Sequence, residues 1–292
     1  MTAGAARPLP TWRSLLFVPA TAQRFVAKAH ARGADAIILD LEDSIPPAEK
    51  EAARAALPAA AATVGQAGAE VCVRINRPLE LAVPDIAAAV MPQVAALMLP
   101  KVMGPEHVRL LSEVVGAREA ALGLPAGHTR LIGIVETPQA LPHLAAIAAA
   151  DPRMAAIGLG SEDLSTELEA VPGADLLYPL GVMVVAAARG AAILPLGSVG
   201  AFADFSDLEG YRAALRRSRR LGFACTACIH PLHVPIINEE YGVAAEEADR
   251  ARRLIATFEA AVARGEGAVA FDGAMIDLPV VERARRLVAR AR

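Results

Sequence analysis

The sequence has few of the features that mark several large classes of protein. Its 292 residues include three cysteines, an odd number that argues against a disulfide framework in a chain of this size. Lysine and arginine number 29 against 32 acidic residues, and the formal net charge of −3 provides no basic surface for a nucleic acid. The N-terminal residues show no apolar signal segment.

Long apolar runs are also missing, although the mean hydropathy is +0.39. The candidate at Ala82–Met98 contains an aspartate, a glutamine and two prolines, so no run approaches the roughly 18 residues that cross a bilayer. Aromatic residues make up only 4% of the chain against 54% hydrophobic residues, so alanine, valine, leucine and isoleucine supply the apolar mass. We therefore expect a cytoplasmic protein that binds neither nucleic acid nor a membrane.

What is present is a repeated pattern of a short aliphatic run, a polar or Gly/Pro loop and an alanine-rich stretch. Continuous rather than alternating apolarity indicates strands that are buried on both faces, as in parallel sheets. The expected strands are Ser14–Val18, Ala36–Leu39, Val71–Ile75, Ala96–Leu99, Leu131–Val135, Ala155–Leu159, Ala191–Leu194 and Ala224–Ile229. Helices are expected after most of them, at Arg24–Arg32, Glu49–Leu57, Pro105–Ala120 and Gln139–Ala149.

Eight such units predict an α/β fold of the (β/α)₈ TIM barrel type over residues 1–235. The alternative is an open doubly wound sheet, which should carry a glycine-rich dinucleotide turn after its first strand; here that strand ends in VPAT. Residues 236–292 are expected to form a C-terminal extension that caps the barrel or reaches a neighbouring subunit. It contains a predicted amphipathic helix at Glu246–Arg264, an Asp-Gly pair typical of a tight hairpin, and a final helix from Pro279.

Ionisable side chains recur where the predicted strands end. In such barrels the active site lies at the carboxyl ends of the strands, so these side chains should share one mouth. They are Asp40, Glu42, Asp43, Arg74, Lys101, Glu136, Glu162, Asp163 and His230.

Glu136 and Asp163 follow neighbouring strands, which lie about 4.8 Å apart, so both carboxylates can converge on one cation. A site with few protein ligands favours Mg²⁺, which keeps positions open for water and substrate oxygens. The alternative is that both acids only complement helix dipoles. Arg74 has the planar fork that suits a carboxylate or a developing enolate oxygen, but it would also serve as a simple counter-charge.

The remaining polar side chains at the strand ends are expected to play supporting roles. Lys101 and the acidic cluster Asp40, Glu42 and Asp43 would hold the principal groups in place. His230 precedes a proline and is expected to be a structural hydrogen-bonding residue. The other histidines, His233 among them, are expected at the surface.

Motifs at eight places occur in a characteristic order: RSLLFVPAT, LDLEDSI, VRIN, LPKV, IVETP, GLGSEDL, CIHP and DGAMIDLPVVERA. From about Arg13 to the C-terminus the chain resembles the citrate lyase β-subunit-like family, which includes malyl-CoA and citramalyl-CoA lyases. The resemblance implies a Mg²⁺-dependent enzyme, with Mn²⁺ as a possible substitute, that assembles as a homotrimer or hexamer and acts on an acyl-CoA and a 2-oxo acid.

The resemblance also implies residue roles. It assigns metal binding to Glu136 and Asp163, and it also places Glu136 in contact with substrate. It assigns substrate binding and catalysis to Arg74. In the family an aspartate of the C-terminal tail enters the active site of a neighbouring subunit, and the matching residue here is Asp277. The alternative role for Asp277 is that of a helix N-cap ahead of Pro279. Coenzyme A phosphates are expected on three basic residues of the first β/α segment, namely Arg13, Arg24 and Lys28.

Three departures from the family pattern concern the expected coenzyme A entrance. Ala20 replaces a common glycine, Thr226 stands where a lysine is common, and His233 replaces a common glutamine. The expected reaction is reversible cleavage of a malyl-CoA or citramalyl-CoA to acetyl-CoA and a 2-oxo acid. The alternatives are a metal-dependent aldolase of free 2-oxo acids and a lyase subunit that depends on a partner or an acyl carrier.

Overall fold

The aliphatic runs of the sequence form the eight strands of one sheet, and nearly all of their side chains are buried. A computed structural model describes residues 8–171, 173–200 and 207–291. The strands are β1 (Ser14–Pro19), β2 (Ala36–Asp40), β3 (Glu70–Arg74), β4 (Val94–Leu99), β5 (Arg130–Val135), β6 (Met154–Leu159), β7 (Leu194–Leu196) and β8 (Thr226–Cys228).

The sheet closes on itself as a barrel. All the pairings are parallel, their order runs from β7 through β6, β5, β4, β3 and β2 to β1, and β1 pairs in turn with β8. β7 and the segment before β8 are joined by an isolated bridge from Leu196 to Cys225 rather than by a regular ladder. The predicted (β/α)₈ barrel is therefore confirmed, with one weak seam between β7 and β8.

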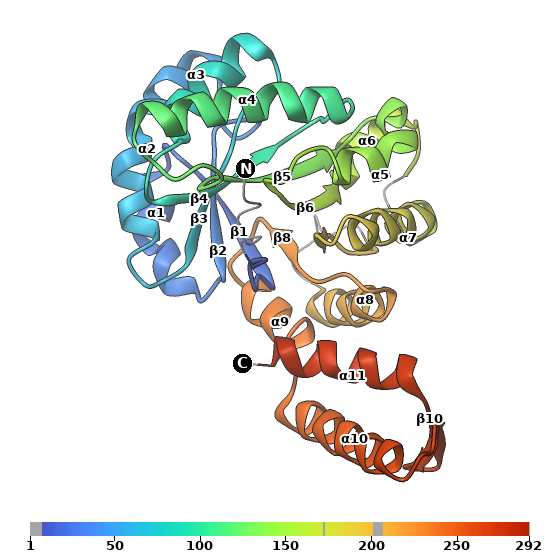
Figure 1. Ribbon diagram of the computed structural model, residues 1–292. Coiled ribbons are helices and arrows are strands. Elements are labelled where there is room, and N and C mark those ends of the chain that lie inside the picture. The colour runs from blue at the N-terminus through green and yellow to red at the C-terminus, as the bar shows by residue number, and fades with distance from the viewer. Residues whose placement is uncertain (1–7, 172, 201–206, 292) are drawn as a thin grey trace. The chain divides into compact units, whose positions relative to one another are not determined.

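Helices surround the strands in the first compact unit, residues 1–238, as Figure 1 shows. They are α1 (Gln23–Ala29), α2 (Lys50–Val64), α3 (Leu79–Ala89), α4 (Pro105–Ala121), α5 (Leu144–Ala148), α6 (Ser161–Glu167), α7 (Ala174–Gly190), α8 (Leu208–Leu221) and α9 (His233–Glu240), the last of which crosses the unit boundary. Three short 3₁₀ segments join them: η1 (His30–Arg32), η2 (Pro47–Glu49) and η3 (Pro138–His143). Among the described helices, none has both the length and the apolarity that a membrane crossing requires.

The seventh strand was predicted too early in the chain. The prediction placed it at Ala191–Leu194, whereas β7 begins at Leu194. Helix α7 continues to Gly190, and Ala192 takes a left-handed backbone conformation with φ +56° in the turn that follows. The alanines of this segment thus belong to a helix end and a turn, which apolarity alone does not distinguish from a strand.

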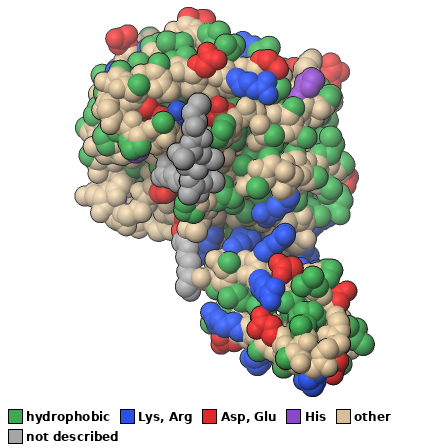
Figure 2. Space-filling view, in the orientation of Figure 1, with side chains coloured by type: hydrophobic (Ala, Val, Ile, Leu, Met, Phe, Trp, Pro, Cys, Tyr) green, Lys and Arg blue, Asp and Glu red, His purple; other side chains and the backbone are tan. Residues whose placement is uncertain are grey.

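Residues 239–292 form a second compact unit with its own small core. It consists of α10 (Ala245–Ala263), the antiparallel pair β9 (Val269–Phe271) and β10 (Ala274–Ile276), and α11 (Leu278–Arg290). Asp272 and Gly273 both have positive φ in the predicted tight turn. Acidic and basic side chains are interspersed on the visible face of this unit in Figure 2, and pairs such as Arg285 with Glu259 link α11 to α10.

Candidate active site

Five of the strand ends bring charged side chains to one mouth of the barrel. Asp40 ends β2 and Arg74 ends β3, and the strand register places these two residues side by side. Lys101 follows β4, Glu136 directly follows β5, and Asp163 lies in the first turn of α6 after β6. Parallel strands that end together therefore assemble this cluster from segments far apart in the sequence.

Arg74 is held in one orientation by two acids. Its Nε and Nη2 donate to the two carboxylate oxygens of Asp40 at 2.6 and 2.8 Å, and Nη1 lies 2.8 Å from Oε2 of Glu42. Burial alone would raise the pKa of Asp40, but hydrogen bonds from Arg74 and Ser44 outweigh it and hold that pKa below its usual value. A guanidinium has five N–H groups, so this fixed Arg74 still has a donor for a substrate oxygen. The guanidinium carbon also lies 4.9 Å from the ring centre of Phe17.

Glu136 is a buried carboxylate on the opposite side of the cluster. Its Oε2 accepts a hydrogen bond of 2.5 Å from the backbone N–H of Lys101, whose own backbone is left-handed with φ +49°. Gly160 leaves room for this side chain, since a Cβ at that position would come within 2.1 Å of Oε1 of Glu136. Burial, together with the nearby carboxylates of Glu42 and Asp163, raises the pKa of Glu136 to about 7. A carboxylate in this position lacks a matching positive charge.

Lys101 connects the two halves of the cluster. Its ammonium group lies 3.1 Å from Glu42, 3.6 Å from Asp43 and 3.7 Å from Asp163. Five carboxylates thus face two cationic side chains, Arg74 and Lys101, which leaves an excess of negative charge when all are ionised. Sequence reasoning found each of these groups, but it missed the contribution of Gly160 and the hydrogen bond from the Lys101 backbone.

The residues fit a divalent cation of the magnesium type. The donors are all carboxylate oxygens, and burial together with the acids Glu42 and Asp163 raises the pKa of Glu136. Among the described residues no group of three or more histidine, cysteine, aspartate or glutamate side chains is spaced to enclose an ion. Two carboxylates with open positions for water and substrate oxygens suit Mg²⁺, which rarely uses an all-protein cage. Glu136 and Asp163 are the pair that would hold it.

A groove of about 780 Å³ joins Arg74 to helix α1. Arg74 and Asp40 line one part of it, and Arg24, Lys28 and Arg32 line another. Arg32 was missed in the sequence, although it completes a set of three cations spaced four residues apart along one helical face.

The predicted basic residue Arg13 lies elsewhere. It precedes β1 and so stands at the amino-terminal end of the strand, away from the mouth. Its Nε and Nη2 both donate to Asp35 at 2.9 Å, and its Nη1 donates to the backbone oxygen of Asn238. The structure therefore does not bring Arg13 together with Arg24 and Lys28, because one strand length separates the two ends of β1.

His233 was expected at the surface, and that prediction is wrong. Only 1% of the residue is exposed, and its ring stacks on Tyr211 with 4.1 Å between centroids. The histidine is the first residue of α9, five residues after the end of β8. A lone histidine in a polar loop gave no periodic signal that would have indicated this burial.

Comparison with known proteins decides the family. A model of the HpcH/HpaI aldolase/citrate lyase family matches residues 13–231, three quarters of the chain. The chain belongs to this family. Citrate lyase subunit beta of Leuconostoc mesenteroides subsp. cremoris is 33% identical over 286 residues, covering 96% of this chain and 93% of that protein. The L-malyl-CoA/beta-methylmalyl-CoA lyase of Cereibacter sphaeroides is 32% identical over 305 aligned positions, covering 96% and 94%.

Solved structures agree with the family assignment. The protein CitE from Mycobacterium tuberculosis, in complex with magnesium, acetoacetate and coenzyme A, matches with a TM-score of 0.75 and 31% identity over 95% of this chain and 97% of that one. RipC from Yersinia pestis matches with a TM-score of 0.66 and 28% identity over 82% and 99%. The resemblance inferred from the ordered motifs is thus confirmed, and with it the prediction of a carbon–carbon lyase.

Proposed function

We propose that this lyase reversibly cleaves short 3-hydroxyacyl-CoA thioesters of the malyl-CoA or citramalyl-CoA type to acetyl-CoA and a 2-oxo acid, with Mg²⁺ as its metal. The observation that carries the proposal is the groove of about 780 Å³ between Arg74 and helix α1. It joins a reaction site rich in carboxylates to a row of three cations. An acyl-CoA has this same layout, with a reactive thioester at one end and phosphates at the other.

The cationic end of the groove suits coenzyme A. Arg24, Lys28 and Arg32 follow one face of α1 and η1, where each can approach a phosphate oxygen. Phe25 beside them is 48% exposed, and the guanidinium of Arg24 lies 4.5 Å from its ring centre, which forms a flat surface next to the cations. The CitE structure with coenzyme A supports this assignment by family similarity.

Mg²⁺ is proposed on Glu136 and Asp163, with Mn²⁺ as a substitute. When bound, the ion acts as a Lewis acid on the oxygens of the 2-oxo acid. Glu136 and Asp163 hold it at the mouth, while Lys101 and the acids Asp40, Glu42 and Asp43 keep the surrounding groups in place. The magnesium named in several CitE structures supports this choice of metal.

The chain's own groups would handle charge and the proton. During cleavage the bond between the carbinol carbon and the thioester's α-carbon breaks, the hydroxyl proton passes to water, and the electron pair moves onto the thioester. Arg74, held rigid by Asp40, donates to the thioester oxygen where that charge develops. Asp277 returns a proton to the α-carbon, which yields acetyl-CoA.

Features of the second unit support Asp277 as a group that acts on another chain. Its carboxylate makes no capping hydrogen bond at the start of α11, so the helix-cap alternative lacks its defining contact. Ile276, the preceding residue, is 3% exposed in the core of the unit and anchors the position. Met275 and Leu278 on either side are 72% and 54% exposed, and a neighbouring subunit would bury them. We therefore propose a homotrimer or hexamer in which residues 236–292 complete a neighbour's site.

One alternative has direct support. The similarity to citrate lyase subunit beta favours a subunit that acts only with a partner or an acyl carrier. The purified protein alone, supplied with Mg²⁺, is expected to release acetyl-CoA from malyl-CoA or citramalyl-CoA. Cleavage only after a carrier or partner is added would establish the alternative, and cleavage of free 2-oxo acid aldols without coenzyme A would indicate an aldolase.

Arg74→Lys is expected to reduce kcat/KM by roughly ten- to a hundredfold, because lysine keeps the charge but loses the fork that pairs with Asp40 and the thioester oxygen. Steady-state kinetics with the wild-type protein give the comparison. Arg109→Lys is the matched control, since Arg109 is 53% exposed on α4 and pairs only with its helix neighbour Glu106 among the charged groups described. Normal turnover of the Arg74→Lys variant would show that Arg74 serves only as a counter-charge.

A further inference from the structure

A second cavity, of about 230 Å³, opens at the seam of the barrel. Strands β7 and β8 have only three residues each. They are joined by a bridge between Leu196 and Cys225 and by backbone hydrogen bonds that include one from Gly197 to the oxygen of Cys225 at 2.8 Å. Residues of β7, β8, α7, α8 and α9 line the cavity.

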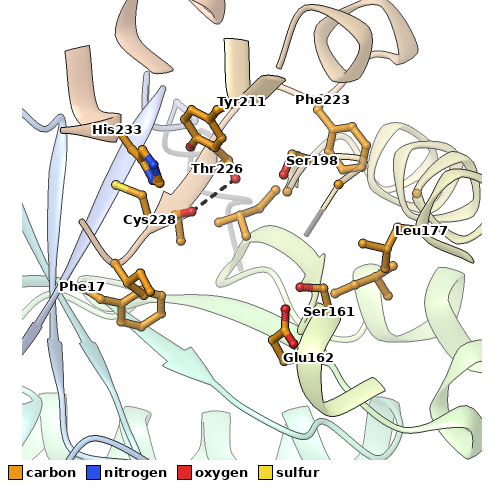
Figure 3. Close-up of a pocket in the computed structure, with 17 residues that line it drawn as sticks. Phe17, Ser161, Glu162, Leu177, Ser198, Tyr211, Phe223, Thr226, Cys228 and His233 are labelled. Atoms are coloured by element: carbon orange, nitrogen blue, oxygen red, sulfur yellow. Dashed lines mark hydrogen bonds between the residues drawn. The ribbon is translucent and has the colours of Figure 1, made fainter. Parts of the chain in front are cut away.

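The described walls of this cavity are mainly apolar. Figure 3 shows the described lining side chains around a common hollow. The large apolar side chains among them are Phe17, Leu159, Leu177, Leu196, Phe223 and Ile229. The described lining residues include no lysine or arginine, and Glu162 is their single acid.

The cavity adjoins the proposed metal site rather than the cationic row of α1. Ser161 and Glu162 line it and directly precede Asp163 in the chain. Phe17 lines both this cavity and the groove of Arg74, and the guanidinium of Arg74 stands over its ring. A 2-oxo acid held at Asp163 would therefore have its remaining substituent beside this opening, while the thioester would approach from the side of α1.

His233 forms part of the deep wall. Figure 3 shows its imidazole near Tyr211, Thr226 and Cys228 on the same side of the hollow. Its Nε2 is buried without a hydrogen-bond partner. Burial and the neighbouring His230 lower the pKa of this imidazole, which disfavours its cationic form.

Thr226 forms another part of this wall. It lines the cavity with a short side chain, and only 4% of the residue is exposed. A longer apolar side chain at position 226 would take up part of the cavity.

We propose that this cavity binds the neutral side chain of a 2-oxo acid larger than pyruvate, an alkyl or aryl group. A cavity of about 150 Å³ holds a benzene molecule, so this one has room for a group of at least about six carbon atoms. The inference rests on the proposed function. In the synthetic direction acetyl-CoA loses an α-proton, its α-carbon bonds to the 2-oxo carbon, and the ketone oxygen gains a proton, with no redox change.

Binding of 2-oxo acids to the Mg²⁺-loaded protein, measured by calorimetry, tests the inference. Affinity should rise about fourfold for each added methylene along the series pyruvate, 2-oxobutanoate and 4-methyl-2-oxopentanoate. Oxaloacetate, whose second carboxylate finds no cation in the cavity, should bind more weakly than 4-methyl-2-oxopentanoate. A flat or falling series, or no binding of any 2-oxo acid, would overturn the inference.

Condensation with acetyl-CoA then separates this inference from the proposed reaction. Tight binding of the larger acids without condensation would contradict the proposed reaction and leave the cavity assignment standing. Condensation with glyoxylate and pyruvate alongside a flat affinity series would overturn the cavity assignment alone.

Variants at position 226 test whether the side chain of the 2-oxo acid binds in this cavity. Thr226→Leu should fill part of the cavity and lower the ratio of affinities for 4-methyl-2-oxopentanoate and pyruvate at least about tenfold. Thr226→Val exchanges only a hydroxyl for a methyl group and should keep the ratio. Thermal unfolding reports whether each variant is folded. If Thr226→Leu does not fold, Cys228→Met, on the same wall of the cavity, takes its place in the test. Equal ratios in the filled and the volume-matched variants would show that the side chain binds elsewhere.

Discussion

Glu136→Gln is expected to eliminate metal-dependent turnover, by at least about a thousandfold, because glutamine replaces one of only two carboxylates proposed for the ion. Calorimetric titration should show Mg²⁺ affinity lost or greatly weakened. In the wild-type protein the binding should release a proton near pH 7, since the pKa of Glu136 is raised to about 7 and the ion requires the ionised form. Unchanged Mg²⁺ affinity in the variant would contradict the site.

The same substitution is expected to stabilise the metal-free protein. Folding raises the pKa of Glu136 from its ordinary value of 4.5 to about 7, so the native state disfavours the ionised carboxylate. That cost is absent below pH 4.5, grows as the pH rises, and is complete above pH 7, where it amounts to about 3 kcal/mol. Glutamine carries no charge, so the substitution removes this cost. Thermal unfolding in a chelator should therefore show Glu136→Gln several degrees more stable than wild type at pH 8, and a smaller difference at pH 5.

Glu119→Gln provides a matched control, for which the expected change in stability has the opposite sign. Glu119 is also buried, but Arg153 and two backbone N–H groups donate to it, and they hold its pKa below the ordinary value. A depressed carboxylate pKa stabilises the fold above that ordinary value, so the amide should destabilise the protein at pH 8. Destabilisation by both substitutions would mean that Glu136 is a structural acid like Glu119.

Asp277→Asn is expected to be inactive alone but to recover activity when mixed with Glu136→Gln. If each site takes Glu136 from one chain and Asp277 from a neighbour, random assembly at equal amounts leaves about a quarter of the sites intact. Co-expression of two differently tagged variants, purified through both tags, gives the mixed assembly. Selection through both tags removes the single-variant assemblies, so about a third of the sites are intact in a mixed trimer and about a quarter in a mixed hexamer. Steady-state turnover should then reach about a quarter to a third of the wild-type value.

Self-contained sites give a different result. Every site would keep one of the two lesions, and turnover would stay at background even in assemblies that carry both tags. That outcome would contradict the shared site and make Asp277 a group that acts on its own barrel. Coexpression of Asp277→Asn with wild-type chains supplies the positive control, since it must be active under either arrangement.

Much of the architecture follows from local patterns that the sequence carries by itself. Aliphatic runs that are apolar on both faces determine buried parallel strands, and the pair Asp272–Gly273 determines a tight hairpin because both residues tolerate positive φ. The acids and bases at the strand ends could be found for the same reason: parallel strands place their carboxyl ends at one mouth whatever the details of packing. Arg74 beside Asp40 is the clearest case, since strand register alone makes them neighbours.

Other features depend on contacts between segments far apart in the chain, and only the tertiary structure decided them. Burial of His233 results from its stacking on Tyr211, more than twenty residues earlier, and no periodic pattern marks it. Arg13 was grouped with Arg24 through the family resemblance, as a basic residue of the first β/α segment, yet strand β1 separates the two residues. The raised pKa of Glu136 arises from burial and from acids on other strands. The opening between β7 and β8 depends on how few backbone bonds join them. Sequence patterns thus determined which groups meet at the mouth, and three-dimensional packing determined their charge state and the space beside them.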